Sequence, residues 1–217
     1  MKLVKASYEI IAPNPINGDA ILHRIESAGR TCYKSTPKDM PDHAAKFVRM
    51  ILDRGHESVI EHESMSVRFV VDRGVSHEIV RHRLVSYSQE STRYCDYEGG
   101  VTFVRPPWVA ASLGEYMNTD GLFLTYADEQ WMQAMLNAEA WYQHLSEAGW
   151  QPQQARSVLP NSLKTEIVCT ANLREWRHIL RLRTSHAAHP QMREVMVPLL
   201  QELHCKMPVI FDDIKAK

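Results

Sequence analysis

The stretch that decides how this chain is organised is RHRLVSYSQESTR, residues 81–93. It holds three arginines, one histidine and three serines, and it has neither glycine nor proline. Apolar residues at helical spacing predict a short helix over residues 76–84. Residues 86–92 are rich in hydroxyl side chains, which compete for backbone hydrogen bonds, so we expect a loop there. Binding groups often lie where a regular element gives way to a loop, so this stretch is the first candidate site.

The chemistry of this stretch indicates an anionic ligand. A phosphate prefers planar guanidinium donors together with short hydroxyl or backbone donors. Ser91-Thr92-Arg93 supplies both kinds within three residues. The plain alternative is a solvated surface in which Arg81 and Arg83 interact favourably with the dipole at the end of a helix. The sequence alone leaves both interpretations open.

Length and composition describe an ordinary globular protein. At 217 residues the chain fits one large domain or two small ones, with 44% hydrophobic and 24% charged residues. The formal net charge of −1 argues against a protein that coats nucleic acid, although a local basic patch is still possible. No apolar run suits a signal peptide or a membrane helix, so we expect a cytoplasmic location.

The cysteines and histidines give little sign of a metal site. The four cysteines lie far apart, without a Cys-x-x-Cys pair, and we expect structural roles for them. The histidine pairs lie six (His56 and His62), five (His77 and His82) and three residues apart (His186 and His189). None has the spacing of a His-Glu-x-x-His zinc helix. The sequence therefore predicts no metal centre.

Hydrophobic periodicity predicts an α+β fold. Expected strands cover residues 3–11, 64–71 and 164–171, and a turn is expected at 72–74. Expected helices cover residues 19–29, 42–54, 76–84, 121–148, 152–159, 173–183 and 191–204. We therefore predict a single domain over residues 1–217, with a small, mostly antiparallel sheet and a helix-rich remainder.

The central stretch also resembles a known family signature. Residues 81–93 match the motif R-H-R-x(2)-S-x(4)-S-x-R of the flavin-dependent thymidylate synthases. Residues 56–62 (HESVIEH) resemble the family's H-E-[ST]-x-x-E-H segment, and residues 156–160 (RSVLP) its R-x-x-L-P segment. Residues 172–183 resemble its late helical site, so the resemblance covers most of residues 20–200.

The resemblance implies a homotetramer of α+β subunits whose flavin sites are built where subunits meet. The implied reaction moves a one-carbon unit from methylenetetrahydrofolate to C5 of dUMP and yields dTMP. NADPH would reduce FAD, and the reduced flavin would supply the hydride that completes the methyl group. The resemblance also implies that no cysteine acts as a nucleophile.

Site residues carry over from the resemblance position by position. Ser91, Arg93 and Arg156 would hold the dUMP phosphate. The other implied dUMP contacts are Glu78, Arg81, Gln89, Glu90 and Thr92. The implied FAD contacts are His56, Ser58, Glu61, Arg81, His82, Arg83, Gln89, Asn172, Arg174 and His178. Arg183 would face the pyrimidine as the catalytic residue, because a fixed cation beside the imide favours its ionised form.

One departure and two alternatives belong beside this prediction. Gln191 stands where family members often have glutamate, and we assign no site residue between 184 and 191. Arginines and tyrosines of residues 81–97 are also compatible with an RNA- or single-strand-binding module. A metal-dependent nucleotide hydrolase is the third possibility.

Overall fold

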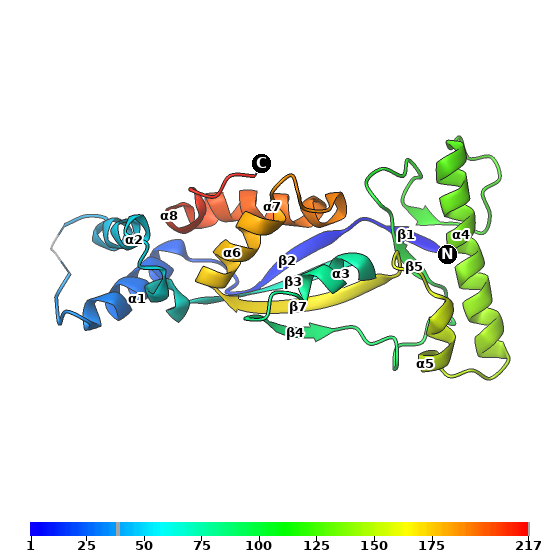
Figure 1. Ribbon diagram of the computed structural model, residues 1–217, viewed down its shortest axis with the longest axis horizontal. Coiled ribbons are helices and arrows are strands. Elements are labelled where there is room, and N and C mark those ends of the chain that lie inside the picture. Colours follow the sequence, from blue (N-terminus) through cyan, green and yellow to red (C-terminus); the bar gives the residue numbers. More distant parts are fainter. Residues whose placement is uncertain (38–39, 217) are drawn as a thin grey trace. The chain divides into compact units, whose positions relative to one another are not determined.

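The computed structural model describes residues 1–37 and 40–216 (Figure 1). The chain forms two compact units. Unit 1 comprises Met1–Ser7, Phe69–Arg81 and Ser88–Ile167. Unit 2 comprises Tyr8–Arg68, His82–Tyr87 and Val168–Lys217. The chain alternates between the units, so neither is one continuous segment. The predicted single domain over residues 1–217 stays a prediction.

Unit 1 is built on a short three-stranded sheet and one long helix. The strands β1 (Lys2–Val4), β5 (Thr102–Val104) and β6 (Gly114–Glu115) have the order β5-β1-β6. β1 pairs parallel with β5 and antiparallel with β6, so this sheet is mixed. Leu3 and Phe103 join Met132 and Tyr142 of α4 (Tyr126–Glu147) in one buried apolar cluster. Unit 1 also contains α3 (Arg73–Ile79), α5 (Pro152–Ala155) and the 3-10 turn η2 (Arg156–Val158).

A four-stranded sheet has the order β2-β3-β7-β4. Its strands are β2 (Ser7–Ala12), β3 (Ser64–Asp72), β7 (Lys164–Asn172) and β4 (Ser86–Gln89). Buried side chains alternate along β7 and most of β3, as expected where successive side chains point to opposite faces of a sheet. The strands predicted at 64–71 and 164–171 are confirmed.

Unit 2 is mainly helical. Its elements include α1 (Gly18–Thr31), α2 (His43–Asp53), the 3-10 helix η1 (Glu57–His62), α6 (Leu173–Arg183), α7 (Pro190–Lys206) and α8 (Pro208–Phe211). Gly29 lies inside α1 rather than at its end. A Cβ there would come within 2.8 Å of the Phe47 ring and 2.9 Å of Val59. The residue expected to end the helix therefore serves instead to let α1 pack closely on its neighbours.

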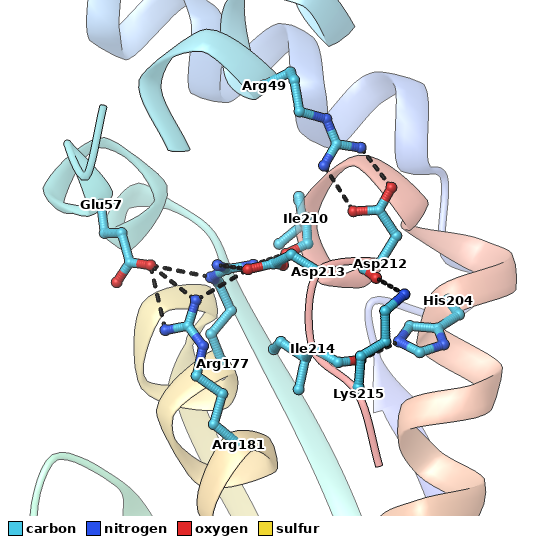
Figure 2. Close-up of polar contacts among 10 residues, drawn as sticks. All are labelled: Arg49, Glu57, Arg177, Arg181, His204, Ile210, Asp212, Asp213, Ile214 and Lys215. Atoms are coloured by element: carbon cyan, nitrogen blue, oxygen red, sulfur yellow. Dashed lines mark hydrogen bonds and ion pairs between the residues drawn. The ribbon is translucent and has the colours of Figure 1, made fainter. Parts of the chain in front are cut away.

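A buried arginine ties α6 to the C-terminal segment (Figure 2). Arg177 is only 2% exposed, and both of its terminal nitrogens donate to the Asp213 carboxylate at 2.7 Å. Arg177 also donates to the Ile210 carbonyl and, at 3.3 Å, to Glu57 of η1. A buried guanidinium is tolerated because its charge is paired and its donors are used. These contacts hold α6 against the C-terminal segment and against η1.

The half-buried Arg49 and the exposed Arg181 extend the same network. Arg49 of α2 makes a two-pronged ion pair with Asp212 at 2.6 and 2.7 Å. Arg181, one turn beyond Arg177, reaches both Glu57 and Asp213 at 3.2–3.4 Å. The C-terminal segment thus contacts α2 and α6 through charged groups, and α6 contacts η1.

The structure corrects the prediction around the central stretch. Asp72 accepts a hydrogen bond from the Val75 backbone N–H at 2.7 Å and so caps α3, which begins at the expected turn. That helix ends at Ile79, so Arg81 and Arg83 lie beyond it. Residues 86–89, expected in a loop, form β4 beside β7. Pairing with a neighbouring strand satisfies the backbone groups that the hydroxyl side chains were expected to divert.

Two further expectations about strands and membranes have an outcome. The strand expected at 3–11 is interrupted at residues 5–6 and forms β1 and β2, which belong to different sheets. The three-stranded sheet is mixed rather than mostly antiparallel. Within residues 1–37 and 40–216, no helix is both long and apolar enough to cross a membrane.

Candidate active site

The structure divides the central stretch between the two units. Arg81 belongs to unit 1, residues 82–87 to unit 2, and residues 88–93 to unit 1 again. All implied dUMP contacts except Arg183 therefore lie in unit 1. All implied FAD contacts except Arg81 and Gln89 lie in unit 2.

In unit 1, a tight turn presents hydroxyl and guanidinium groups. The backbone N–H groups of Tyr94 and Cys95 both donate to the Ser91 carbonyl, at 3.1 and 2.9 Å. Nη1 of Arg156 donates to the buried Thr92 hydroxyl at 2.9 Å. Arg93 and Arg156 remain exposed. Thr92 therefore orients Arg156, and the two arginines and Ser91 are the groups best able to meet an anion.

Gln89 and Glu90 are held by hydrogen bonds inside unit 1. The Gln89 amide nitrogen donates to Ser76 and Thr165 at 3.0 and 3.2 Å. The Glu90 carboxylate accepts from the Tyr97 hydroxyl at 2.8 Å and from Nζ of Lys164 at 2.9 Å. Both side chains are thus oriented before any ligand arrives.

Sequence reasoning missed two cations of unit 1. Lys164, on β7, bridges Glu90 and Glu166. Nη1 of Arg73 is buried and has no hydrogen-bond partner among the described residues. Burial and the hydrogen bond to Glu90 raise the pKa of Tyr97, and the nearby Arg73 opposes this rise. Nothing in the local sequence distinguished these two side chains, because their relevance comes from tertiary contacts.

In unit 2, Arg183 and His82 form a directed pair. Nε of Arg183 donates to Nε2 of His82 at 3.0 Å, although the residues are 101 positions apart. His82 is 6% exposed, and its Nδ1 lies 3.7 Å from a Glu175 oxygen. Burial, then the charges of Arg183 and His178, lower the pKa of His82 to about 4. His82 is therefore neutral near pH 7 and serves as an acceptor that orients Arg183.

The neutral His82 predicts a loss of stability in acid. Between about pH 4 and 6.5, His82 binds more protons in the unfolded protein than in the folded protein. The free energy of unfolding therefore rises with pH across that window. Acidification from pH 7 to 4.5 should cost the wild type roughly 2 kcal/mol more than His82→Gln. Urea unfolding at both pH values measures the difference. Equal acid losses in the two proteins would contradict the prediction.

Most implied flavin contacts of unit 2 line two surface cavities. One, of about 590 Å³, is lined by His56, Ser58 and Arg174 among others. The second, of about 660 Å³, is lined by Glu61, Asn172, Arg174 and His178. Glu57 and Arg174 border both cavities. His82 and Arg83 line neither of these two.

The residues around the cavities suit a large cofactor that carries phosphates. Arg174 and His178 are exposed, and Nη1 of Arg174 lies 2.5 Å from Glu61. An exposed ion pair of this kind contributes little to stability, so its arginine can turn to a phosphate at small cost. Apolar side chains of the first cavity, such as Phe47 and Met50, offer a surface for a ring. The donor set therefore fits a flavin nucleotide.

The same region contains one group with metal-ligand geometry. The nearest ligand atoms of His82, Glu175 and His178 all lie within 4.8 Å of one another. However, Nε2 of His82 already accepts from Arg183, whose permanent positive charge opposes a bound cation. This arrangement gives a metal-dependent hydrolase little support.

Solved structures share this fold. The chain superimposes on a UMP/dUMP methylase, PolB from Streptomyces cacaoi bound with 5-Br UMP, with a TM-score of 0.73 and 23% identity. The match covers 98% of this chain and 95% of that chain. The same enzyme bound with 5-Br dUMP gives a TM-score of 0.70 and 24% identity, over 98% and 96% of the two chains.

Curated relatives are similar in sequence over most of the chain. A flavin-dependent thymidylate synthase of Mycobacterium sp. (strain KMS) is 37% identical over an alignment of 210 residues that covers 88% of this chain and 79% of the relative. The enzyme of the same description from Mycobacterium tuberculosis (strain ATCC 25177 / H37Ra) is 35% identical over 197 residues, with the same coverage.

Together, the fold and these relatives define an enzyme of the methyltransferase type. The model of the family described as thymidylate synthase complementing protein matches residues 19–209. The chain belongs to that family, which confirms the family that the sequence resemblance indicated.

Proposed function

We propose that this enzyme converts dUMP to dTMP, with methylenetetrahydrofolate as one-carbon donor and NADPH as reductant through FAD. Family membership supports the reaction class. One observation carries the proposal: Arg183 donates a hydrogen bond to His82, which orients the permanent positive charge of the arginine. His82 is neutral near pH 7 and adds no charge of its own. This arrangement is what activation of an imide requires.

The exposed turn of unit 1 is proposed to bind the dUMP phosphate. Arg93 and Arg156 supply guanidinium donors, and Ser91 supplies a hydroxyl. Thr92 holds Arg156 in place through its hydroxyl oxygen. Glu78, Arg81, Gln89 and Glu90 are proposed to line the rest of the nucleotide. Because Gln89 and Glu90 are oriented in advance, binding costs little side-chain entropy there.

Arg183 is proposed to act on the pyrimidine. Its charge beside the imide lowers the pKa at N3, and the ionised ring carries more electron density at C5. C5 then forms a bond to the methylene carbon, whose two bonds to the folate nitrogens break in turn, leaving both nitrogens on tetrahydrofolate. Loss of the C5 proton and addition of a hydride complete the methyl group. His82 keeps Arg183 aimed through the 3.0 Å hydrogen bond between Nε and Nε2.

The cavities of unit 2 are proposed to hold FAD. Its proposed contacts there are His56, Ser58, Glu61, His82, Arg83, Asn172, Arg174 and His178, with Arg81 and Gln89 contributing from unit 1. When bound, the reduced flavin supplies the hydride. The proposed homotetramer builds each site from more than one subunit, so Arg81 and Gln89 need not serve the same site as the other contacts.

No cysteine is proposed as nucleophile. Cys169 is 1% exposed, and burial raises the pKa of its thiol to about 12, so it carries no thiolate near pH 7. Changing Cys169 to alanine and the other three cysteines to serine should keep dTMP formation within about tenfold of wild type, because no step needs a thiolate. Turnover measured on the folded variant tests this. A folded variant without activity would restore a thiol mechanism.

An anaerobic assay tests the proposed function. The purified protein should be yellow and should form dTMP from dUMP, methylenetetrahydrofolate, FAD and NADPH, with each component required. A chelator should not stop the reaction. A colourless protein that binds neither FAD nor dUMP would refute the proposal. Binding of single-stranded RNA that weakens steeply with salt, without dTMP formation, would favour the nucleic-acid alternative.

A further inference from the structure

We propose that α1 and α2 carry a zinc site formed by His23, Glu26 and His43. The three side chains lie within unit 2, and none of them is among the implied dUMP or FAD contacts. Their nearest ligand atoms all lie within 4.8 Å of one another. His23 and Glu26 are one turn apart on α1, and His43 begins α2.

The distances bracket those of a tetrahedral zinc site. Oε2 of Glu26 lies 2.7 Å from Nδ1 of His43 and 4.0 Å from Nδ1 of His23. Zinc bonds of about 2.0–2.1 Å place neighbouring ligand atoms about 3.3 Å apart. A shift of less than about 1 Å along each of these two contacts therefore brings them to the zinc spacing. His23 is largely exposed and free to make that shift, with 58% of its side chain accessible.

The Glu26 carboxylate is held as a ligand needs to be held. Glu26 is 2% exposed, and its Oε1 accepts from Nε and Nη2 of Arg30 at 2.8 and 2.7 Å. Its Oε2 faces the two histidines and is hydrogen-bonded to Nδ1 of His43 at 2.7 Å, a contact that a bound ion would replace. Metal-binding carboxylates are usually oriented by such outer hydrogen bonds. The Arg30 charge weakens the attraction for a dication, so we expect a site of moderate rather than high affinity.

Access and donor type both favour zinc. Two surface cavities, of about 400 and 260 Å³, are each lined by His23 and His43, so an ion and a water ligand can reach them. Two imidazoles, one carboxylate and an open fourth position make a common donor set for zinc. Magnesium and calcium prefer oxygen ligands.

Bound zinc would link α1 to α2. The ion stabilises the folded state because the preformed ligand set is absent from the unfolded chain. The two helices also supply Gly29, Phe47 and Met50 to the smaller of the two cavities proposed for the flavin. The zinc inference does not depend on that proposal, and its test involves neither flavin nor dUMP.

Zinc titration of the full chain, after treatment with a chelator, tests the site. Isothermal calorimetry should show the wild type binding zinc, with one equivalent lost in His23→Gln and in His43→Gln. His144→Gln, which alters an exposed histidine of unit 1, should bind as the wild type does. Zinc should also raise the unfolding temperature of the wild type by several degrees and leave that of His43→Gln unchanged.

Cobalt gives an independent spectroscopic reading. Co²⁺ in the site should produce visible absorption typical of tetrahedral coordination, and this absorption should disappear in His23→Gln. His23 takes no part in the ion pair between Glu26 and Arg30, and its Nδ1 lies 4.0 Å from Glu26. Its replacement therefore leaves the fold intact. Wild-type zinc stoichiometry in both His23→Gln and His43→Gln, or no zinc binding by the wild type, would overturn the proposal.

Discussion

Arg183→Ala is expected to reduce dTMP formation by roughly 10²–10³-fold, the usual effect of removing one preorganised charge donor from an active site. The neighbouring His82 cannot replace the lost charge, because it is neutral near pH 7, with its pKa lowered to about 4. The loss should appear mainly in kcat, since the charge is needed as the ring ionises. Steady-state kinetics under anaerobic conditions measure it.

Two further variants make the result specific. Arg183→Lys keeps the charge but loses the planar guanidinium that donates to His82, so it should recover only part of the activity. Arg24→Ala removes an exposed arginine of α1 that pairs with Glu63 and lines neither proposed flavin cavity. This variant should retain wild-type turnover. Wild-type kcat in a folded Arg183→Ala protein would refute the catalytic role.

The helix that carries Arg183 was predicted correctly from the sequence, for a simple physical reason. The helix predicted at 173–183 is α6, with the same bounds, because its apolar residues recur at helical spacing and Asn172 caps its first turn. The Asn172 side chain accepts from the Glu175 backbone N–H at 2.8 Å. Both signals are local, so sequence could place this element accurately.

Prediction was weaker where tertiary contacts decide. The helix expected at 121–148 begins only at Tyr126, so Phe123 lies before it and is fully exposed. The 86–89 segment becomes a strand through its neighbour β7. His23 and His43 are twenty positions apart and meet only because α1 packs on α2, so spacing rules for metal ligands could not find them.

Arg156→Ala is expected to raise the KM for dUMP by roughly 10²-fold, equivalent to about 2–3 kcal/mol of lost binding. Two charge-assisted hydrogen bonds from one guanidinium to a phosphate account for a loss of that size. Thr92→Val should have a smaller effect in the same direction, because it removes the hydroxyl that holds Nη1 of Arg156 at 2.9 Å. Kinetics with varied dUMP measure both variants.

Deoxyuridine separates phosphate binding from every other cause of weak binding. It lacks the phosphate, so its weak affinity should be the same for wild type and Arg156→Ala, whereas dUMP affinity should differ by roughly 10²-fold. If Arg156 instead only supported the fold of the turn at residues 91–95, both ligands would lose affinity together. Equal losses for the two ligands would therefore remove Arg156 from the phosphate site and leave Arg93 and Ser91 to bind the anion. A loss confined to dUMP requires direct contact between Arg156 and the phosphate, because only the phosphate distinguishes the two ligands.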